Sequence, residues 1–237
     1  MLSYSVVSLI FAIALIGYLL ARFFVSFKKS RNNISDNLPQ FHFMIFLLAV
    51  MFFLVTRLVI AFFGPDLTVN STSKFAGSPD YLLLFTVGSI SSLSLAVALL
   101  LLVFTGLSFR GVKKFEYIWG FSHLMLWLIA FLTVDITVSY APNQGWFFRS
   151  GELANYLVNL PSIVFLAYFL VDMFMINKSI KSASIKNKFN QFIIGLVILT
   201  FLIMINYTFI VKYFGNYGID VIAIAVSSVL FYKSLKK

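Results

Sequence analysis

Long apolar segments alternate with short polar segments along the whole chain. Seven of the apolar segments approach or exceed the about 20 helical residues, at about 1.5 Å each, that cross a hydrocarbon layer of about 30 Å. They are rich in Leu, Ile, Phe and Val without strict alternation, which favours helices, because a lone lipid-facing strand leaves its backbone unsatisfied. The pattern predicts helices at residues 4–27, 41–64, 81–109, 117–141, 152–176, 192–214 and 217–232.

Composition supports this interpretation. Of the 237 residues, 61% are hydrophobic and 11% are charged, against about 45–50% and about 25% in ordinary soluble domains. This excess excludes a soluble globule and a disordered chain. No loop exceeds about 16 residues, so we expect one domain over residues 1–237 with no soluble domain. The predicted fold class is all-α, a polytopic integral membrane bundle of seven transmembrane helices.

Lys and Arg residues predict the orientation, because short loops rich in these residues stay in the cytoplasm. Fourteen of the 18 lie in one alternate set of loops and helix ends: Arg22, Lys28, Lys29, Arg31, Arg110, Lys113, Lys114, Lys178, Lys181, Lys186, Lys188, Lys233, Lys236 and Lys237. The opposite set holds four: Arg57, Lys74, Arg149 and Lys212. We therefore expect an external N-terminus and a cytoplasmic C-terminus in a multi-pass protein of the cell membrane.

Polar residues inside a membrane helix are costly and indicate function or helix packing. Five of them, Arg57, Asp135, Asn159, Asn206 and Asp220, fall at similar depths, roughly 5 to 12 Å from the predicted outer boundary when counted at 1.5 Å per residue. A buried arginine needs a carboxylate partner, and amide side chains complete such a site. The predicted ligand-binding residues are Arg57, Asp135, Asn155, Asn159, Asn206 and Asp220. The alternative is that Arg57 and one aspartate form an ion pair that only fixes helix order.

A second polar set lies in the predicted cytoplasmic half and consists of His42, Glu116, His123 and Asp172. A bis-histidine haem is one interpretation, but the two histidines differ in depth by about 8 Å. The simpler interpretation is a hydrogen bond from His123 to Asp172 and an interfacial His42. A proton relay through these residues is the third interpretation. We expect no cofactor, and the absence of cysteine excludes thiolate metal sites.

The chain contains no HExxH, GxSxG, GxGxxG or P-loop motif, so we assign no catalytic or metal-ligating residue and expect no enzyme. Two functions remain open. One is a small transporter or channel-like protein that binds a small polar or anionic solute in an outer-half cavity. The other is a non-catalytic receptor-like or accessory subunit of a membrane complex, whose basic loops contact anionic lipid or an acidic cytoplasmic protein. We attribute the positive charge to the orientation of the chain in the membrane and expect no nucleic-acid partner.

Overall fold

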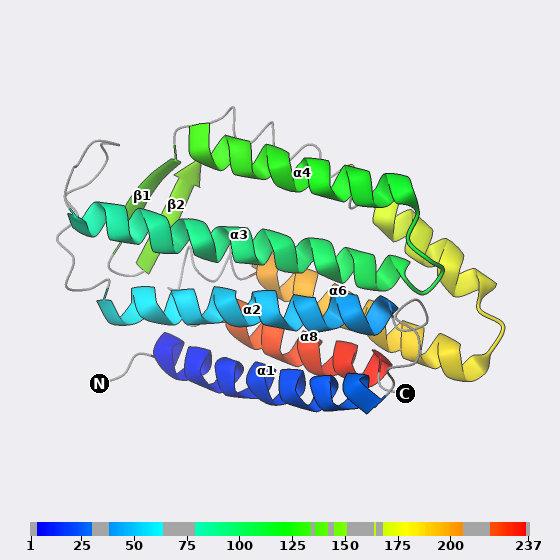
Figure 1. Ribbon diagram of the computed structural model, residues 1–237. Helices are drawn as coiled ribbons and strands as arrows, with labels where there is room; N and C mark the ends of the chain where they lie inside the picture. The colour runs from blue at the N-terminus through cyan, green and yellow to red at the C-terminus, as the bar shows by residue number, and fades with distance from the viewer. Residues whose placement is uncertain are drawn as a thin grey trace.

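The computed structural model describes residues 4–29, 38–63, 79–133, 136–141, 145–150, 164, 168–205 and 219–235, and these residues are mainly helical. The helices with defined bounds are α1 (Tyr4–Lys29), α2 (Leu38–Phe63), α3 (Pro79–Leu107), α4 (Lys114–Thr133), α6 (Ala183–Ile205) and α8 (Ile219–Leu235). Residues 168–179 are also helical. Figure 1 shows the helices lying side by side along one elongated bundle, with successive helices running in opposite directions.

Helix boundaries agree with the apolar pattern to within a few residues for α1, α2 and α3. Two differences have physical reasons. α6 begins at Ala183, nine residues before the predicted apolar start, because its first residues include the good helix formers Ala183, Lys186 and Lys188. α4 ends at Thr133, and residues 136–141 of the segment predicted to be one helix form a strand.

One antiparallel hairpin departs from the all-α prediction. Strand β1 (Ile136–Ala141) pairs with β2 (Gly145–Ser150), with Ile136 opposite Ser150 and Ala141 opposite Gly145. β1 opens with the β-branched residues Ile136, Thr137 and Val138, which lose rotamer freedom in a helix and favour an extended backbone. The apolar count alone did not distinguish these residues from the helix that precedes them.

Among the residues that the structure describes, two helices are long and apolar enough to cross a membrane, with windows Val6–Val25 of 20 residues in α1 and Leu38–Val59 of 22 residues in α2. Shorter apolar helices cover Leu93–Leu107 and Val221–Leu235. Only 33% of the first window and 44% of the second are buried inside the bundle. Large apolar side chains therefore face outward along both helices, among them Phe11, Phe24 and Phe52.

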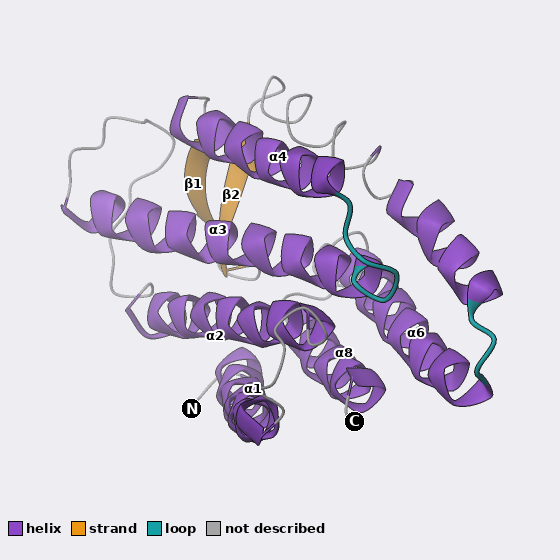
Figure 2. Cartoon of the chain, turned by 45° about the vertical axis from the view of Figure 1, so that its right-hand side comes forward, coloured by secondary structure: helices purple, strands orange, loops and turns teal. Residues whose placement is uncertain are grey.

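The described helices share one aromatic core. α2 packs against α1 and α3, α3 against α4, and α8 against α1, α2 and α6 (Figure 2). Five of these elements each bury a phenylalanine completely: Phe43 in α2, Phe104 in α3, Phe169 in residues 168–179, Phe192 in α6 and Phe231 in α8. The Phe231 ring centroid lies 5.0 Å from that of Phe192 and 6.4 Å from that of Phe43. Such tilted and edge-on contacts are favourable for aromatic pairs.

Candidate functional site

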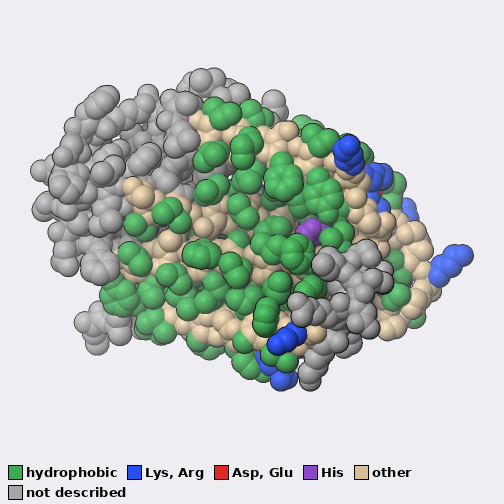
Figure 3. Space-filling view, in the orientation of Figure 1, with side chains coloured by type: hydrophobic (Ala, Val, Ile, Leu, Met, Phe, Trp, Pro, Cys, Tyr) green, Lys and Arg blue, Asp and Glu red, His purple; other side chains and the backbone are tan. Residues whose placement is uncertain are grey.

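Cations gather at one end of the bundle. α1, α3, residues 168–179 and α8 all end there, and α2, α4 and α6 all begin there (Figure 1). Among the Lys and Arg side chains that the structure describes, all but Arg57 belong to this basic end: Arg22, Lys28, Arg110, Lys113, Lys114, Lys178, Lys181, Lys186, Lys188 and Lys233. Figure 3 shows these blue side chains over one part of the surface, beside a mostly apolar flank.

A tight turn between α3 and α4 organises this end. Gly111 has a φ of +92°, which a side chain disfavours, and the amide of Arg110 donates to the carbonyl of Leu107 at 3.1 Å. α4 then begins with a cap: the carboxylate of Glu116 accepts the backbone N–H of Lys113 at 2.8 Å. This is the return half of a capping box, with Glu116 at the third helical position. The turn thus carries Arg110 and Glu116 to the same point.

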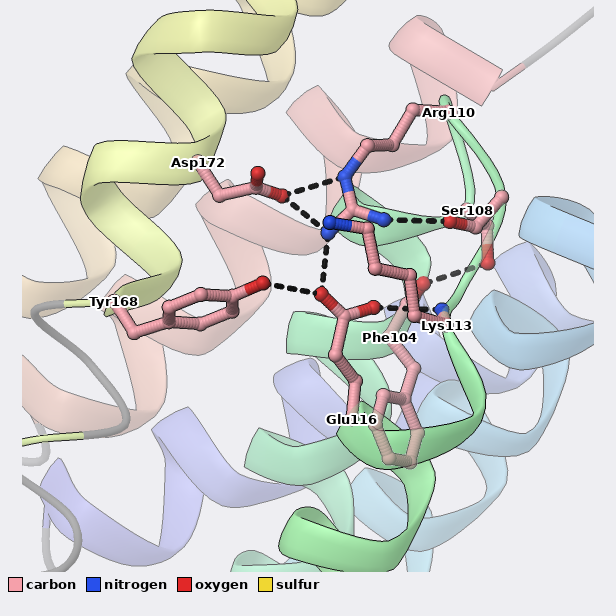
Figure 4. A network of polar contacts seen from close by, with 8 residues as sticks. Phe104, Ser108, Arg110, Lys113, Glu116, Tyr168 and Asp172 are labelled. Atoms are coloured by element: carbon pink, nitrogen blue, oxygen red, sulfur yellow. Dashed lines mark hydrogen bonds and ion pairs between the residues drawn. The ribbon is translucent and has the colours of Figure 1, made fainter.

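Arg110 joins the turn to the helical residues 168–179, as Figure 4 shows. Its Nε donates to Asp172 Oδ2 at 2.7 Å, and its Nη2 lies 2.6 Å from the same oxygen and also bonds Glu116 Oε1. Its Nη1 donates to the carbonyl of Gly111 at 2.7 Å. The hydroxyl of Tyr168 donates to Glu116 Oε1 at 2.7 Å. Arg110, Glu116, Tyr168 and Asp172 form what we call the inner network.

Both carboxylates of the inner network are buried: Glu116 is 0% exposed and Asp172 is 4% exposed, whereas the Arg110 side chain is 20% exposed. Burial alone would raise the pKa of Glu116, but hydrogen bonds from Arg110, the Lys113 amide and Tyr168 outweigh it, and the net pKa is lowered. Burial likewise opposes the charge of Arg110, and its bonds to Glu116 and Asp172 raise its pKa. Arg110 and Glu116 therefore stay charged at neutral pH.

His42 of α2 forms a second chain of hydrogen bonds beside this network. Its Nδ1 lies 2.9 Å from Ser108 Oγ, and its Nε2 lies 3.3 Å from the hydroxyl of Tyr117. Ser108 Oγ donates its single proton to the carbonyl of Phe104 at 2.6 Å. It must therefore accept from Nδ1–H of His42, which leaves Nε2 to accept from Tyr117. The α3–α4 turn is thus held to α2 on one side and to residues 168–179 on the other.

The inner network adds partners that the sequence interpretation did not name. Asp172 pairs with Arg110, where the sequence suggested a bond to His123. His42 is only 5% exposed and lies inside the bundle. Hydrogen bonds engage both of its ring nitrogens, which disfavours the haem alternative, because an axial ligand needs a free nitrogen lone pair directed at the iron. The described residues contain no group of three or more His, Asp or Glu that could hold a metal ion.

The predicted outer-half site lies mostly beyond the residues that the structure describes. Arg57 is in α2, half-buried, with its guanidinium carbon 5.5 Å from the Phe53 ring centroid. Asp220 lies in the first turn of α8. The remaining members are outside the described residues: Asp135, Asn155, Asn159 and Asn206. Whether these six residues meet stays a prediction.

Sequence reasoning missed Arg110 and Tyr168 as site residues, because Arg110 counted only as a loop cation and Tyr168 only as part of an apolar helix. One signal was present. Asp172 lies in an apolar segment and needs a cation as its partner. Arg110 precedes Glu116, the acidic residue in the first turn of α4, by six residues.

The comparisons with known proteins add no further information. No family model matches the chain, and no match was found among the curated proteins or the solved structures. Functional inference therefore depends on the residues of this chain alone.

Proposed function

We propose that this chain is an integral membrane protein that crosses the bilayer seven times, with its N-terminus outside and its C-terminus in the cytoplasm of a cell. Three observations support the proposal. The windows in α1 and α2 are less than half buried, unlike the core helices of a soluble protein. Many large apolar side chains are exposed on the helix flanks. All described Lys and Arg side chains except Arg57 lie at the end where α8 finishes, as expected for a cytoplasmic face.

Within that architecture we propose transport of a small polar or anionic solute through a site in the outer half. The observation that carries this proposal is Arg57. It interrupts the apolar sequence of α2 about six residues, or roughly 9 Å, before the helix ends at Phe63, far from all the other described cations. A cation at such a depth is costly unless it serves a ligand or an ion pair. A carboxylate of Asp135 or Asp220 would balance its charge when no anion is bound.

The inner network fits this function as the closed cytoplasmic side of a transporter. A site that opens outward must be sealed inward, and alternating access then requires the seal to break. Two of its contacts join residues 168–179 to other elements: Asp172 to Arg110 of the α3–α4 turn, and Tyr168 to Glu116 of α4. The contact from Arg110 to Glu116 joins the turn to the first turn of α4 and need not change. Separation of residues 168–179 from the turn would therefore open this end while Arg110 keeps one carboxylate partner.

Uptake into proteoliposomes tests the transport proposal, with radiolabelled inorganic phosphate, lactate and glutamate as probes. The variant with Arg57→Ala and Asp135→Ala should lose uptake of whichever probe the unmodified protein carries, because both charges of the proposed site are gone. Arg22→Ala is the matched control, since it removes an exposed cation of the basic end. Full uptake by the double variant would show that the outer-half site is wrong.

A further inference from the structure

The basic end exposes cations without exposed carboxylates among the described residues. The only acidic side chains described there are Glu116 and Asp172, and both are buried against Arg110. Most of the other described cations at this end are exposed. The surface at this end is therefore strongly positive and suits an anionic partner.

Three exposed lysines flank the connection between residues 168–179 and α6, within nine residues of sequence. They are Lys178 at the end of residues 168–179, Lys181 in the connection and Lys186 in the first turn of α6, and Lys188 follows in α6. We call the three exposed side chains the lysine triad. α6 has no acidic residue in its first turn. Cations near a helix N-terminus oppose the helix dipole, and an anion bound there would offset that unfavourable interaction.

The helices that carry the triad also have apolar outer flanks. Ile185, between Lys181 and Lys186, is 50% exposed, and farther along α6 Ile194 and Val197 are exposed. Phe174 and Met175 are exposed on residues 168–179. Positive charge at a helix end, continuous with apolar flanks, matches a molecule with an anionic head and hydrocarbon tails.

We propose that the lysine triad binds the headgroup of an anionic glycerophospholipid from the cytoplasmic leaflet, with its acyl chains along the exposed flanks of residues 168–179 and α6. The phosphate accepts hydrogen bonds from the ammonium groups, and the long lysine stems extend to the headgroup level. This inference rests on the proposed membrane location but not on transport, so either can fail without the other.

The test uses the purified full chain in a neutral detergent, with phosphatidylglycerol or phosphatidylcholine of the same acyl chains added. Thermal unfolding and native mass spectrometry report stabilisation and bound lipid. We expect phosphatidylglycerol to raise the Tm and to stay bound, and phosphatidylcholine to do neither. The variant Lys178→Gln, Lys181→Gln, Lys186→Gln should bind phosphatidylglycerol on the order of 100-fold more weakly. The corresponding triple Arg variant should keep most of the affinity.

The matched control is Lys28→Gln, Lys114→Gln, Lys233→Gln, which removes the same charge from other helices of the basic end and should retain most of the binding. Equal losses of affinity in both triple variants would overturn the site, because they would indicate attraction by the total positive charge of the basic end and not by the lysine triad. Equal stabilisation by phosphatidylcholine would overturn the charge recognition. Stabilisation by soluble polyglutamate but not by phosphatidylglycerol would assign the surface to an acidic protein instead. If the triple Gln variant does not fold, Lys178→Gln with Lys181→Gln should show a smaller loss of the same kind.

Discussion

At the scale of single residues, Arg110 holds the inner network together. Within the described part of the chain it bonds two buried carboxylates, Glu116 and Asp172. Its rigid planar group directs Nε and Nη2 to Asp172 and Nη1 to the Gly111 carbonyl, a fork of donors that a compact lysine ammonium cannot reproduce. Removing one partner of a buried pair is costly because the other charge stays buried.

Arg110→Ala should therefore lower the free energy of unfolding by about 3 kcal/mol. Arg110→Lys should recover part of this loss, since it restores the charge but not the fork of donors. Arg22→Ala, an exposed site, should change stability by no more than about 0.5 kcal/mol. Unfolding in detergent, followed by circular dichroism, measures all three. Equal stability of Arg110→Ala and the unmodified chain would contradict the structure.

Glu116 should make stability depend on acid pH. Its pKa is lowered in the folded chain from the ordinary value of 4.5, so the folded state favours the ionised form more than the unfolded state does. Its stabilising contribution is complete above the unfolded-state value and declines as the pH falls through the lower, folded-state pKa. Tm measured from pH 7 down to pH 3 should show this decline. Glu116→Gln should start from a lower Tm and show a weaker decline.

At the scale of elements, close helix approach depends on glycine at a few positions. A Cβ added at Gly120 of α4 would lie 2.6 Å from Leu100 Cδ1 and 2.7 Å from Phe104 Cζ of α3. A Cβ added at Gly17 of α1 would lie 3.8 Å from Met51 Cε of α2, which is an ordinary van der Waals contact. The same substitution should therefore act in opposite directions at these two positions.

Gly120→Ala should destabilise the chain by about 1–2 kcal/mol, because the overpacking outweighs the better helix propensity of alanine. Gly17→Ala should be neutral or stabilising by up to about 1 kcal/mol. Thermal unfolding of the two variants under identical conditions provides the comparison. The opposite order of stability would indicate that α3 and α4 do not approach as the structure has them.

At the scale of the whole molecule, orientation and the inner seal can be tested without knowing the solute. Because the chain has no cysteine, a single introduced cysteine is the one thiol that a maleimide can label, and its labelling rate measures how accessible that position is. Tyr168→Cys, together with Asp172→Asn, should react with a membrane-impermeant maleimide from the cytoplasmic side several times faster than Tyr168→Cys alone, because the second change weakens the bond to Arg110. Equal labelling rates would mean that the inner network is not a seal.

The seven-span topology has its own measurement. Tags at the two termini should be accessible from opposite faces of the membrane, the N-terminal tag from outside. The start of α1 and the end of α8 already lie at opposite ends of the bundle (Figure 1). Both tags on one face would overturn the proposed topology and the shared depth of Arg57 and Asp135.

The sequence by itself determined the helical character, the approximate ends of α1, α2 and α3, and the segregation of cations, because apolar run length and charge are local properties of the chain. It could not separate β1 from the helix before it, since both are apolar and only the β-branched residues differ. Only the tertiary structure decided the partners of Glu116, Asp172 and His42. Their side-chain partners are 6 to 75 residues distant in sequence, and no local pattern specifies which helix ends meet. A buried charge reveals that it needs a partner, but packing alone selects which one it receives.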